Sequence, residues 1–500
     1  MSEPTAPAVP SEAPAVAPSE SASASESAPQ VGAQRPGIEL PPVDGAAAIE
    51  RLRAMIRVPT ISRLDESVTE WARFDDFVAL LPQLFPATHG ALTREVVAGH
   101  SLLYRWAGRR SAAGEPGVAD DGAAAEPTVL MAHYDVVAAD AAGWQHPPFD
   151  AVLEPGTEEH GDVLWGRGTL DDKGAAGALF EAVESWVLAG FQPEHDIYLS
   201  LGHNEETTGT GASAIVDLLE ERGVRPALVI DEGGAIVEDI FPGVTGPIAV
   251  IGVSEKGICS VRLTVHQAGG HASTPPRMTA TVRLARAITR LNRRRFPASF
   301  TPTNLEMIRT LGGHGTGLLG FVFRHVDLFK LPLLGLFGRL SDETNAIVRT
   351  TAAVTQLVGS SAANALPEQA QAIVNVRVAA GSSVAQMMRH IERSVHDPLV
   401  HIEALHPNEP SPTSPTTGPG WDLMADSVRA SYPGTIVTPY VMLGASDGRH
   451  FTRISDHVYR FTPFEMSSAE RGTLHAVNER IRVRTFLTGI TFYQRIVGGC

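Results

Sequence analysis

The stretch PTVLMAH, residues 127–133, begins the part of the chain that decides the fold. KGAAGALFEAVESWVLAG at 173–190 and HDIYLSLG at 195–202 follow it. The first and third are apolar runs of strand length, and the second has the length of a helix and ends in glycine. A helix at 211–223 and a strand at 227–231 continue the alternation. Such alternation predicts an α/β fold, with a mostly parallel sheet and flanking helices.

The hydrophobic pattern changes near residue 250 and indicates a second domain. Residues 258–266 and 370–378 alternate apolar and polar side chains, as half-exposed antiparallel strands do. Helices are predicted at 279–294 and 382–396. The predicted organisation is a disordered tail (1–37), a first part of the α/β domain (38–253), an inserted α+β domain (254–408) and a second part of the α/β domain (409–500).

Composition restricts the partners that we expect. The 500 residues carry a formal net charge of −16, which argues against nucleic acid because phosphate binding needs clustered Lys and Arg. No run approaches the length of a membrane span, so no membrane partner is expected. Residues 1–34 lack the basic start and apolar stretch of a secretory signal, and the two cysteines imply no oxidising compartment. We therefore expect a cytoplasmic protein.

Acidic and histidine clusters follow the predicted strands. They are HYD at 133–135, DDKG at 171–174, NEE at 204–206 and DEGG at 231–234. Ligands of open α/β sheets bind at the carboxyl ends of the strands, so these clusters can converge there. Converging carboxylates repel one another unless cations neutralise them. Imidazole and carboxylate ligands without thiolates suit Zn²⁺, Mn²⁺ or Co²⁺.

Each cluster alone is weak evidence, since an isolated H-x-D is more often a surface turn. Their order along the chain is more specific, and with the neighbouring motifs it resembles the aminoacylase/carboxypeptidase family of two-zinc metallopeptidases. The nearest resemblance is to the branch of the yeast vacuolar carboxypeptidase and the mammalian N-acyl amino acid synthase/hydrolase. The motifs are VLMAHYDVV (129–137), WGRGTLDDKG (165–174), GHNEETTGTGA (202–212), VIDEGG (229–234), GGHASTPP (269–276), SDGRHF (446–451) and LHAVNE (474–479).

The resemblance implies two Zn²⁺ ions, with Co²⁺ or Mn²⁺ possible. One metal would have His133, Asp171 and Asp231 as ligands. The other would have Asp171, Glu206 and His475, so that Asp171 bridges both. The family resemblance also implies a two-zinc exopeptidase fold, whose inserted domain is a ferredoxin-like lid and dimerisation domain.

The residues beside these ligands have implied roles of their own. Glu205 matches the general base, which takes a proton from a water shared by the two metals during attack on an amide carbon. Asp135 matches the carboxylate that orients His133. Asp172 leaves it open which of two adjacent carboxylates bridges the metals, and alignment to the preceding GRG favours Asp171.

The predicted lid contributes further candidates. By resemblance, His271 steadies the oxyanion, often from the partner subunit, which implies a possible homodimer through the inserted domain. Asn364 and Arg377 resemble residues that contact the substrate and grip its carboxylate, a task suited to the guanidinium fork. Arg449 is either a second carboxylate grip or part of a structural turn.

The implied function is hydrolysis of an amide bond next to a free carboxylate. The substrate would be a small molecule or short peptide, and the enzyme an N-acyl amino acid amidohydrolase or a carboxypeptidase. Alternatives are a hydrolase of another acylated metabolite, such as a desuccinylase, and a non-catalytic binding protein on this scaffold. Intact candidate ligands disfavour the last.

Two features of the predicted insert remain. GTGLLG at 315–320 matches a dinucleotide-binding fingerprint, but a predicted helix precedes it where the fingerprint needs a strand, so we expect no NAD site. Residues 296–356 are rich in Leu, Phe and Gly. They either line an apolar pocket for an acyl chain or aromatic side chain, or pack within their own domain or at a dimer contact.

Overall fold

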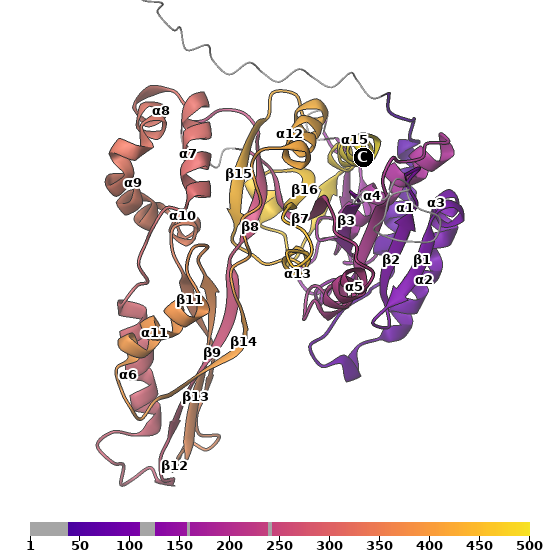
Figure 1. Cartoon of the computed structure of the whole chain (residues 1–500). Helices are drawn as coiled ribbons and strands as arrows, with labels where there is room; N and C mark the ends of the chain where they lie inside the picture. Colours follow the sequence, from indigo (N-terminus) through magenta and orange to yellow (C-terminus); the bar gives the residue numbers. More distant parts are fainter. Residues whose placement is uncertain (1–38, 111–125, 158–160, 239–242) are drawn as a thin grey trace, which may run out of the picture. The chain divides into compact units, whose positions relative to one another are not determined.

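Eight strands form the central sheet of this computed structural model, which describes residues 39–110, 126–157, 161–238 and 243–500. They are β1 (Thr93–Val97), β2 (Ser101–Trp106), β3 (Thr128–His133), β6 (Ile197–Gly202), β7 (Leu228–Val237), β8 (Ile248–Glu255), β15 (Ile436–Met442) and β16 (Val458–Met466). Their order is β1-β2-β6-β3-β7-β16-β8-β15 (Figure 1). The neighbours β6, β3, β7 and β16 are parallel, which confirms the predicted α/β fold.

Helices cover both faces of this sheet because its strands are apolar on both sides. Leu130 of β3 packs in one core, whereas Val129 and Met131 pack in the other. The first core contains residues of α1 (Gly45–Ile56), α2 (Trp71–Leu84), α4 (Lys173–Leu188), α12 (Pro419–Ser431) and α15 (Val483–Gly499), and Phe85 and Leu92, which flank α3 (Pro86–Ala91). The second contains residues of α5 (Thr210–Glu221) and α13 (Gly448–Phe451).

A second sheet is antiparallel, as the alternating pattern of residues 258–266 and 370–378 predicted. It consists of β9 (Gly257–His266), β11 (Thr351–Val358), β13 (Gln369–Val378) and β14 (His401–Asn408), in the order β11-β13-β9-β14. Alternate residues of β9 and β13 pack against α6 (Ala280–Arg293) and α11 (Val384–Val395) in a separate core. The short strands β10 (Gly270–His271) and β12 (Ala365–Leu366), far apart in the sequence, pair antiparallel in a separate two-stranded sheet, to which we give the name lid hairpin.

Four helices correct the predicted extent of the inserted domain. They are α7 (Pro302–His314), α8 (Gly317–Arg324), α9 (Val326–Leu340) and α10 (Asp342–Ile347). Their buried side chains, such as Met307 and Phe337, belong to the same core as Ile236 of β7. Residues 254–408 therefore do not pack as one domain, because the apolar faces of these helices are buried with the central sheet. The GTGLLG motif links α7 to α8 without a preceding strand, as predicted.

A small sheet brings the late part of the chain beside the Asp171 loop. It pairs β4 (Val152–Glu154) with β5 (Val163–Trp165) and β5 with β17 (Arg480–Arg482), and α14 (Ser468–Arg471) lies shortly before β17. The predicted tail at 1–37 lies outside the described residues. Within the described ranges, no helix is long and apolar enough to cross a membrane.

Candidate active site

The predicted strand ends meet at one edge of the central sheet. β3 ends at His133, which is paired in register with Gly202, the last residue of β6. On its other side, Leu130 of β3 pairs with Ile230 of β7. The segments that follow β3 and β6 therefore leave the sheet at one level, with Glu205 and Glu206 three and four residues beyond the end of β6.

Asp171 lies between two histidines. Its Oδ1 is 3.1 Å from Nε2 of His133, and its Oδ2 is 2.8 Å from Nε2 of His475. The same nitrogen of His475 is 3.1 Å from Oε2 of Glu206. Asp172 instead accepts a hydrogen bond from the backbone N–H of His133. The structure therefore places Asp171, and not Asp172, where one carboxylate can serve two metal ions.

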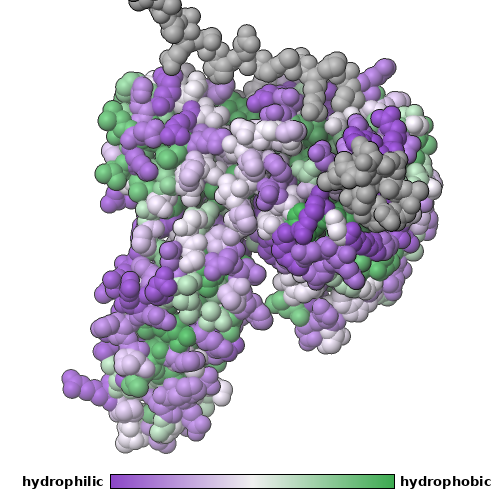
Figure 2. Space-filling model, in the orientation of Figure 1, coloured by the Kyte–Doolittle hydropathy of each residue, from purple (hydrophilic) through white to green (hydrophobic). Residues whose placement is uncertain are grey.

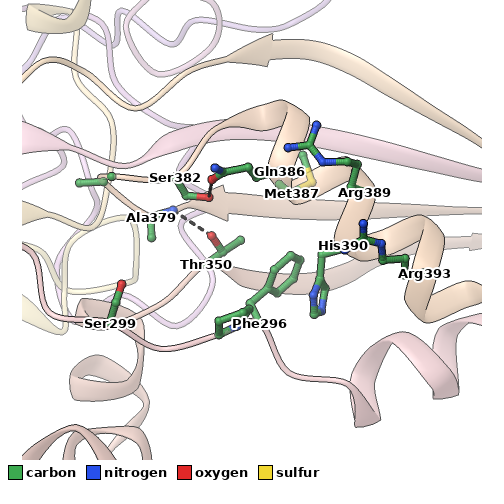
Figure 3. Close-up of a pocket in the computed structure, with 13 residues that line it drawn as sticks. Phe296, Ser299, Thr350, Ala379, Ser382, Gln386, Met387, Arg389, His390 and Arg393 are labelled. Atoms are coloured by element: carbon green, nitrogen blue, oxygen red, sulfur yellow. Dashed lines mark hydrogen bonds between the residues drawn. The ribbon is translucent and has the colours of Figure 1, made fainter. Parts of the chain in front are cut away.

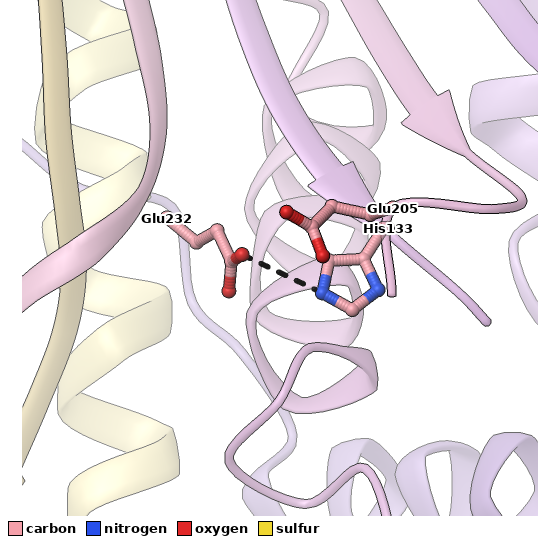
Figure 4. A group of neighbouring side chains, drawn as sticks. All are labelled: His133, Glu205 and Glu232. Atoms are coloured by element: carbon pink, nitrogen blue, oxygen red, sulfur yellow. Dashed lines mark ion pairs between the residues drawn. The ribbon is translucent and has the colours of Figure 1, made fainter. Parts of the chain in front are cut away.

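Of the two adjacent acids on β7, Glu232 is the one whose carboxylate approaches His133. Its Oε1 is 3.6 Å from Nε2 of His133, and Glu205 lies on the same side of that ring (Figure 4). Asp231 accepts a hydrogen bond from the N–H of Gly448 at 2.5 Å. Successive residues of a strand point to opposite faces, so a ligand shifted by one position changes sides. Both carboxylates are in the DEGG string. The alternation of side chains along the strand is the sequence signal that could have indicated which of them faces His133.

We call the converging side chains the Asp171 group: His133, Asp171, Glu205, Glu206, Glu232 and His475. Within it, two sets have ligand atoms that all lie within 4.8 Å of one another. One set is His133, Asp171 and Glu206, and the other is His133, Glu205 and Glu232. Both sets offer only imidazole nitrogen and carboxylate oxygen, the ligand types that Zn²⁺ accepts.

Asp135 orients the group from behind. Its Oδ1 is 3.3 Å from Nδ1 of His133, the ring nitrogen that faces away from Asp171. Its two carboxylate oxygens accept hydrogen bonds from the backbone N–H groups of Glu205 and Glu206. The fully buried Asp135 thus fixes both the imidazole and the segment that carries two acids, the arrangement found behind metal-binding histidines.

Glu479 holds the loop that carries Asp171, and sequence reasoning assigned it no role. Its Oε1 accepts hydrogen bonds from the N–H groups of Gly168, Leu170 and Asp171. Its Oε2 is 2.5 Å from Nη1 of Arg167. Both partners of this ion pair are buried, so the loop cannot move without leaving a buried charge unpaired.

The Asp171 group has four carboxylates but only two histidines that could carry a positive charge. Burial, reinforced by the charge of Glu232, raises the pKa of Glu205 well above its ordinary value. Burial and the neighbouring Asp171 raise the pKa of Glu232 to about 8. Hydrogen bonds to Asp171 and Glu206 raise the pKa of His475 to about 10. The raised pKa values mean that these carboxylates bind protons more readily than free carboxylates do, unless another cation neutralises their charge.

The group fits divalent cations. Oε1 of Glu206 is buried and has no hydrogen-bond partner among the described residues. In the described part of the chain, the ion pairs of Asp171 go only to the two histidines, so no lysine or arginine pairs with this carboxylate there. A cation is the ligand that satisfies both observations.

The two arginines predicted to bind substrate, Arg377 and Arg449, interact electrostatically with each other. The pKa of Arg377, on β13, is lowered mainly by burial and further by the charge of Arg449, while Glu255 and Glu205 oppose the shift. Arg449 donates a hydrogen bond to the carbonyl of Ser446. The charge of Arg449 therefore disfavours that of Arg377, whereas the charge of Glu205 favours it.

Asp447 is a buried acid beside these arginines. Its carboxylate oxygens are buried and lack a hydrogen-bond partner among the described residues, and Oδ1 is 3.9 Å from Nη2 of Arg449. Burial raises the pKa of Asp447 to about 7. The SDGRHF string pointed to this loop, but nothing in the string showed that the aspartate is buried.

His271 and Asn364 lie elsewhere, on the lid hairpin. The N–H of Ala272 donates to the carbonyl of Asn364, so the two residues are neighbours. His271 is exposed, and its Nδ1 accepts a hydrogen bond from the N–H of Ser273. Within the described part of the chain, neither residue forms a hydrogen bond or ion pair with the Asp171 group.

A hollow beside the second sheet is a weaker candidate site. It has a volume of about 410 Å³, and the Phe296 ring stacks on His390 at its wall (Figure 3). Some of its polar groups are paired with each other, since Ser382 donates to Gln386 and the N–H of Ala379 donates to Thr350. It lacks the unpaired buried acids that mark the Asp171 group.

Comparisons with known proteins agree with this site. Residues 129–498 match the model of peptidase family M20/M25/M40. The chain is 33% identical over 456 residues to human N-fatty-acyl-amino acid synthase/hydrolase PM20D1, covering 90% of this chain and 86% of that protein. It is 30% identical over 512 residues to carboxypeptidase S of Saccharomyces cerevisiae, covering 90% of this chain and 84% of the relative.

A solved structure shows the same fold. The M20 family metallo-carboxypeptidase Sso-CP2 from Sulfolobus solfataricus superposes with a TM-score of 0.63 at 17% identity, covering 90% of this chain and 98% of that one. The homologues indicate a hydrolase that acts on peptide or N-acyl bonds. From the converging acids and histidines, the α/β fold and these matches together, the chain belongs to peptidase family M20/M25/M40.

Proposed function

We propose that this chain is a two-zinc N-acyl amino acid amidohydrolase. The observation that carries the proposal is the position of Asp171, whose two oxygens each approach a different histidine. The names of the human and yeast relatives place N-acyl amino acid and carboxypeptidase chemistry among its homologues. Both reactions break an amide bond beside a free carboxylate.

Asp171, His133 and Glu232 would hold one metal ion, and Asp171, Glu206 and His475 the other. This division differs from the sequence-based one only in Glu232, which replaces Asp231 because of its approach to His133. When bound, the two ions would polarise the amide carbonyl and lower the pKa of water. We propose zinc because the donors are imidazole and carboxylate, and Co²⁺ or Mn²⁺ would suit the same ligands.

Glu205 would act as the general base. Its carboxylate belongs to the set that includes His133 and Glu232, and Asp135 fixes its backbone. Glu205 takes a proton from the attacking water as the water oxygen bonds to the amide carbon. It then gives that proton to the leaving nitrogen as the carbon–nitrogen bond breaks. The products are a carboxylic acid and a free amino acid, and Glu205 ends ionised again.

Arg377 and Arg449 would bind the free carboxylate of the substrate. Arg377 is partly buried, and Arg449 and Glu205 both contribute to the shift of its pKa, which supports a place for the substrate carboxylate beside it. A bidentate guanidinium contact fixes orientation as well as charge. Asn364 would contact the substrate only when the lid hairpin approaches the site.

We also propose a homodimer that completes the site. β11 is an edge strand of the second sheet, and it exposes Val354, Leu357 and Val358. An exposed apolar edge strand is a surface for pairing with another chain. The exposed His271 would then reach the partner subunit's Asp171 group and donate a hydrogen bond to the developing oxyanion.

A substrate panel tests the proposed function. Purified protein is assayed with N-acetyl, N-decanoyl and N-oleoyl derivatives of leucine and phenylalanine, and with the dipeptides Ala-Leu and Ala-Phe. The same assays follow treatment with a chelator and reconstitution with Zn²⁺, Co²⁺ or Mn²⁺. We expect hydrolysis of N-acyl amino acids that the chelator abolishes and zinc restores. Hydrolysis of dipeptides alone would favour a carboxypeptidase, and activity that survives complete metal removal would refute the metal mechanism.

A further inference from the structure

An apolar cavity adjoins the Asp171 group. It has a volume of about 640 Å³, within the ~300–1,000 Å³ range of small-molecule pockets. Helices α8, α9 and α10 form one wall, with Phe323, Leu336 and Phe337 among the lining residues. β7, β15 and β16 form the other wall, which includes Ala235 and Met442.

The chain connects this cavity directly to the proposed ligands. Gly233 and Gly234, which follow Glu232, line the cavity, and so does Leu474, which precedes His475. A side chain at Gly234 would come within 1.9 Å of the carbonyl oxygen of Val250. The close packing therefore requires glycine at this point, and the backbone beyond Glu232 itself forms the cavity wall.

The charged groups in the wall are already satisfied. Among the described lining residues, Glu343 and Arg471 pair with each other at 3.2 Å. Ser341 and Thr344 form hydrogen bonds with each other at the start of α10. A charged or strongly polar ligand would find no unpaired opposite charge here, whereas an aliphatic chain needs none.

We infer that this cavity receives the unbranched acyl chain of the substrate, so that α8–α10 set the preference for chain length. The inference rests on the proposed N-acyl amino acid amidohydrolase function and assigns its acyl site. The amide bond would lie at the Asp171 group, with the amino acid carboxylate toward Arg377 and Arg449. The acyl chain would then leave past Gly233 and Gly234 into the cavity.

The outer surface of the same helices supplies a matched control. Leu336 lines the cavity and is 45% exposed, whereas Leu331, on the same helix α9, is 79% exposed and does not line it. Figure 2 shows hydrophobic residues on the surface over α8 and α9. Leu336→Asp places a charge in the proposed acyl site, and Leu331→Asp places the same charge on the surface.

The first experiment is a chain-length series of N-acyl leucines from acetyl to myristoyl, each kept in its soluble concentration range. With the wild type, we expect kcat/KM to rise by about fourfold per added methylene until the cavity is filled. Leu336→Asp should lower the decanoyl-to-acetyl ratio of kcat/KM by at least about tenfold, while Leu331→Asp keeps the wild-type ratio. A flat series, or equal losses in both variants, would overturn the acyl site and indicate a surface effect such as contact between copies.

A binding measurement separates this inference from the proposed function. Fluorescence titration with cis-parinaric acid, a fatty acid probe, is carried out on the wild type and both variants. We expect binding to the wild type and Leu331→Asp, and at least about tenfold weaker binding to Leu336→Asp. If the probe binds in this pattern but no N-acyl amino acid is hydrolysed, the function is wrong and the apolar site stands. Hydrolysis without dependence on chain length, and without probe binding, would leave the function and refute the site.

Discussion

Two histidines with catalytic assignments lie in opposite environments. His133 is 2% exposed, and Asp171, Glu232 and Asp135 surround its ring nitrogens. His271 is exposed on the lid hairpin, where its hydrogen bond goes to the backbone of its own turn. The Asp171 group is assembled by the strand ends of one chain. The lid hairpin has the predicted residue types, but among the described residues neither His271 nor Asn364 forms a hydrogen bond or ion pair with the Asp171 group.

The difference indicates that the two regions contribute at different stages. The Asp171 group offers all of its candidate metal ligands from one chain. The lid hairpin would reach such a group, as proposed above, only if the second sheet moved or a partner subunit supplied the group. Substitutions in the two regions should therefore have different signatures, metal loss in one and loss of rate with metal retained in the other.

Asp171→Asn should have the largest effect. An amide cannot offer two anionic oxygens, so both proposed metal positions lose a ligand. We expect kcat to fall on the order of a thousandfold or more and the zinc content to drop well below that of the wild type. Elemental analysis after dialysis, beside steady-state kinetics, measures both. Retention of full zinc content in this variant would contradict the bridging role.

Glu232→Gln and Asp231→Asn form a matched pair on the same strand. Because Glu232 approaches His133 while Asp231 accepts a backbone hydrogen bond, only Glu232→Gln should weaken metal binding. We expect kcat/KM to fall by about two to three orders of magnitude for Glu232→Gln, with a much smaller loss for Asp231→Asn. Zinc titration by isothermal calorimetry distinguishes them. The reverse order of effects would restore Asp231 as the ligand.

His271→Ala should lower kcat by about a hundredfold without changing zinc content, since it removes one hydrogen bond to the oxyanion. If the histidine comes from the partner subunit, mixing this variant with Glu205→Gln should restore activity, because one site of the mixed dimer has both residues. Activity recovered on mixing is the measured quantity. A mixture as inactive as its components would place His271 outside the partner's site.

Lys256 lies between β8 and β9, at the junction of the two sheets. Lys256→Met should have the smallest effect of these changes, on the pH dependence of stability alone. Nζ of Lys256 donates to the carbonyls of Ala346 and Arg349, and burial lowers its pKa from 10.5 to about 8. The folded state then binds fewer protons than the unfolded state between these values. The free energy of unfolding should therefore rise with pH from about 8 to 10.5 because of this group.

Chemical denaturation across that pH range measures the rise. Lys256→Met should reduce it, while the same change at the exposed Lys330 should not. An unchanged pH dependence in Lys256→Met would show that the lysine is charged in the folded protein, despite its burial.

Much of the fold was predictable because its strands and helices have strong local patterns. β3, β6 and β13 appear within two residues of their predicted bounds, as do α4 and α11. Residues 71–91 form the two helices α2 and α3, with Pro86 starting the second. The position of α7–α10 was not predictable, because an apolar helix face does not specify which neighbouring core will bury it.

The motifs that form the site were predictable from the sequence, but the contacts of individual side chains were less so. The strings around His133 and Glu205 placed two clusters at strand ends, where the structure has them, whereas Asp171 lies in the loop just before α4. The choice between Asp231 and Glu232 depends on which face of β7 each residue occupies. The support that Glu479 gives the Asp171 loop depends on a contact across more than 300 residues of sequence.

The most direct test of the central claim is the rate of Glu205→Gln at measured zinc content. The account predicts a protein that binds zinc and N-decanoyl-leucine as the wild type does but has kcat lowered by about a hundredfold to ten-thousandfold, since only proton transfer is lost. A variant with full zinc content and undiminished kcat would contradict Glu205 as the general base of this hydrolase.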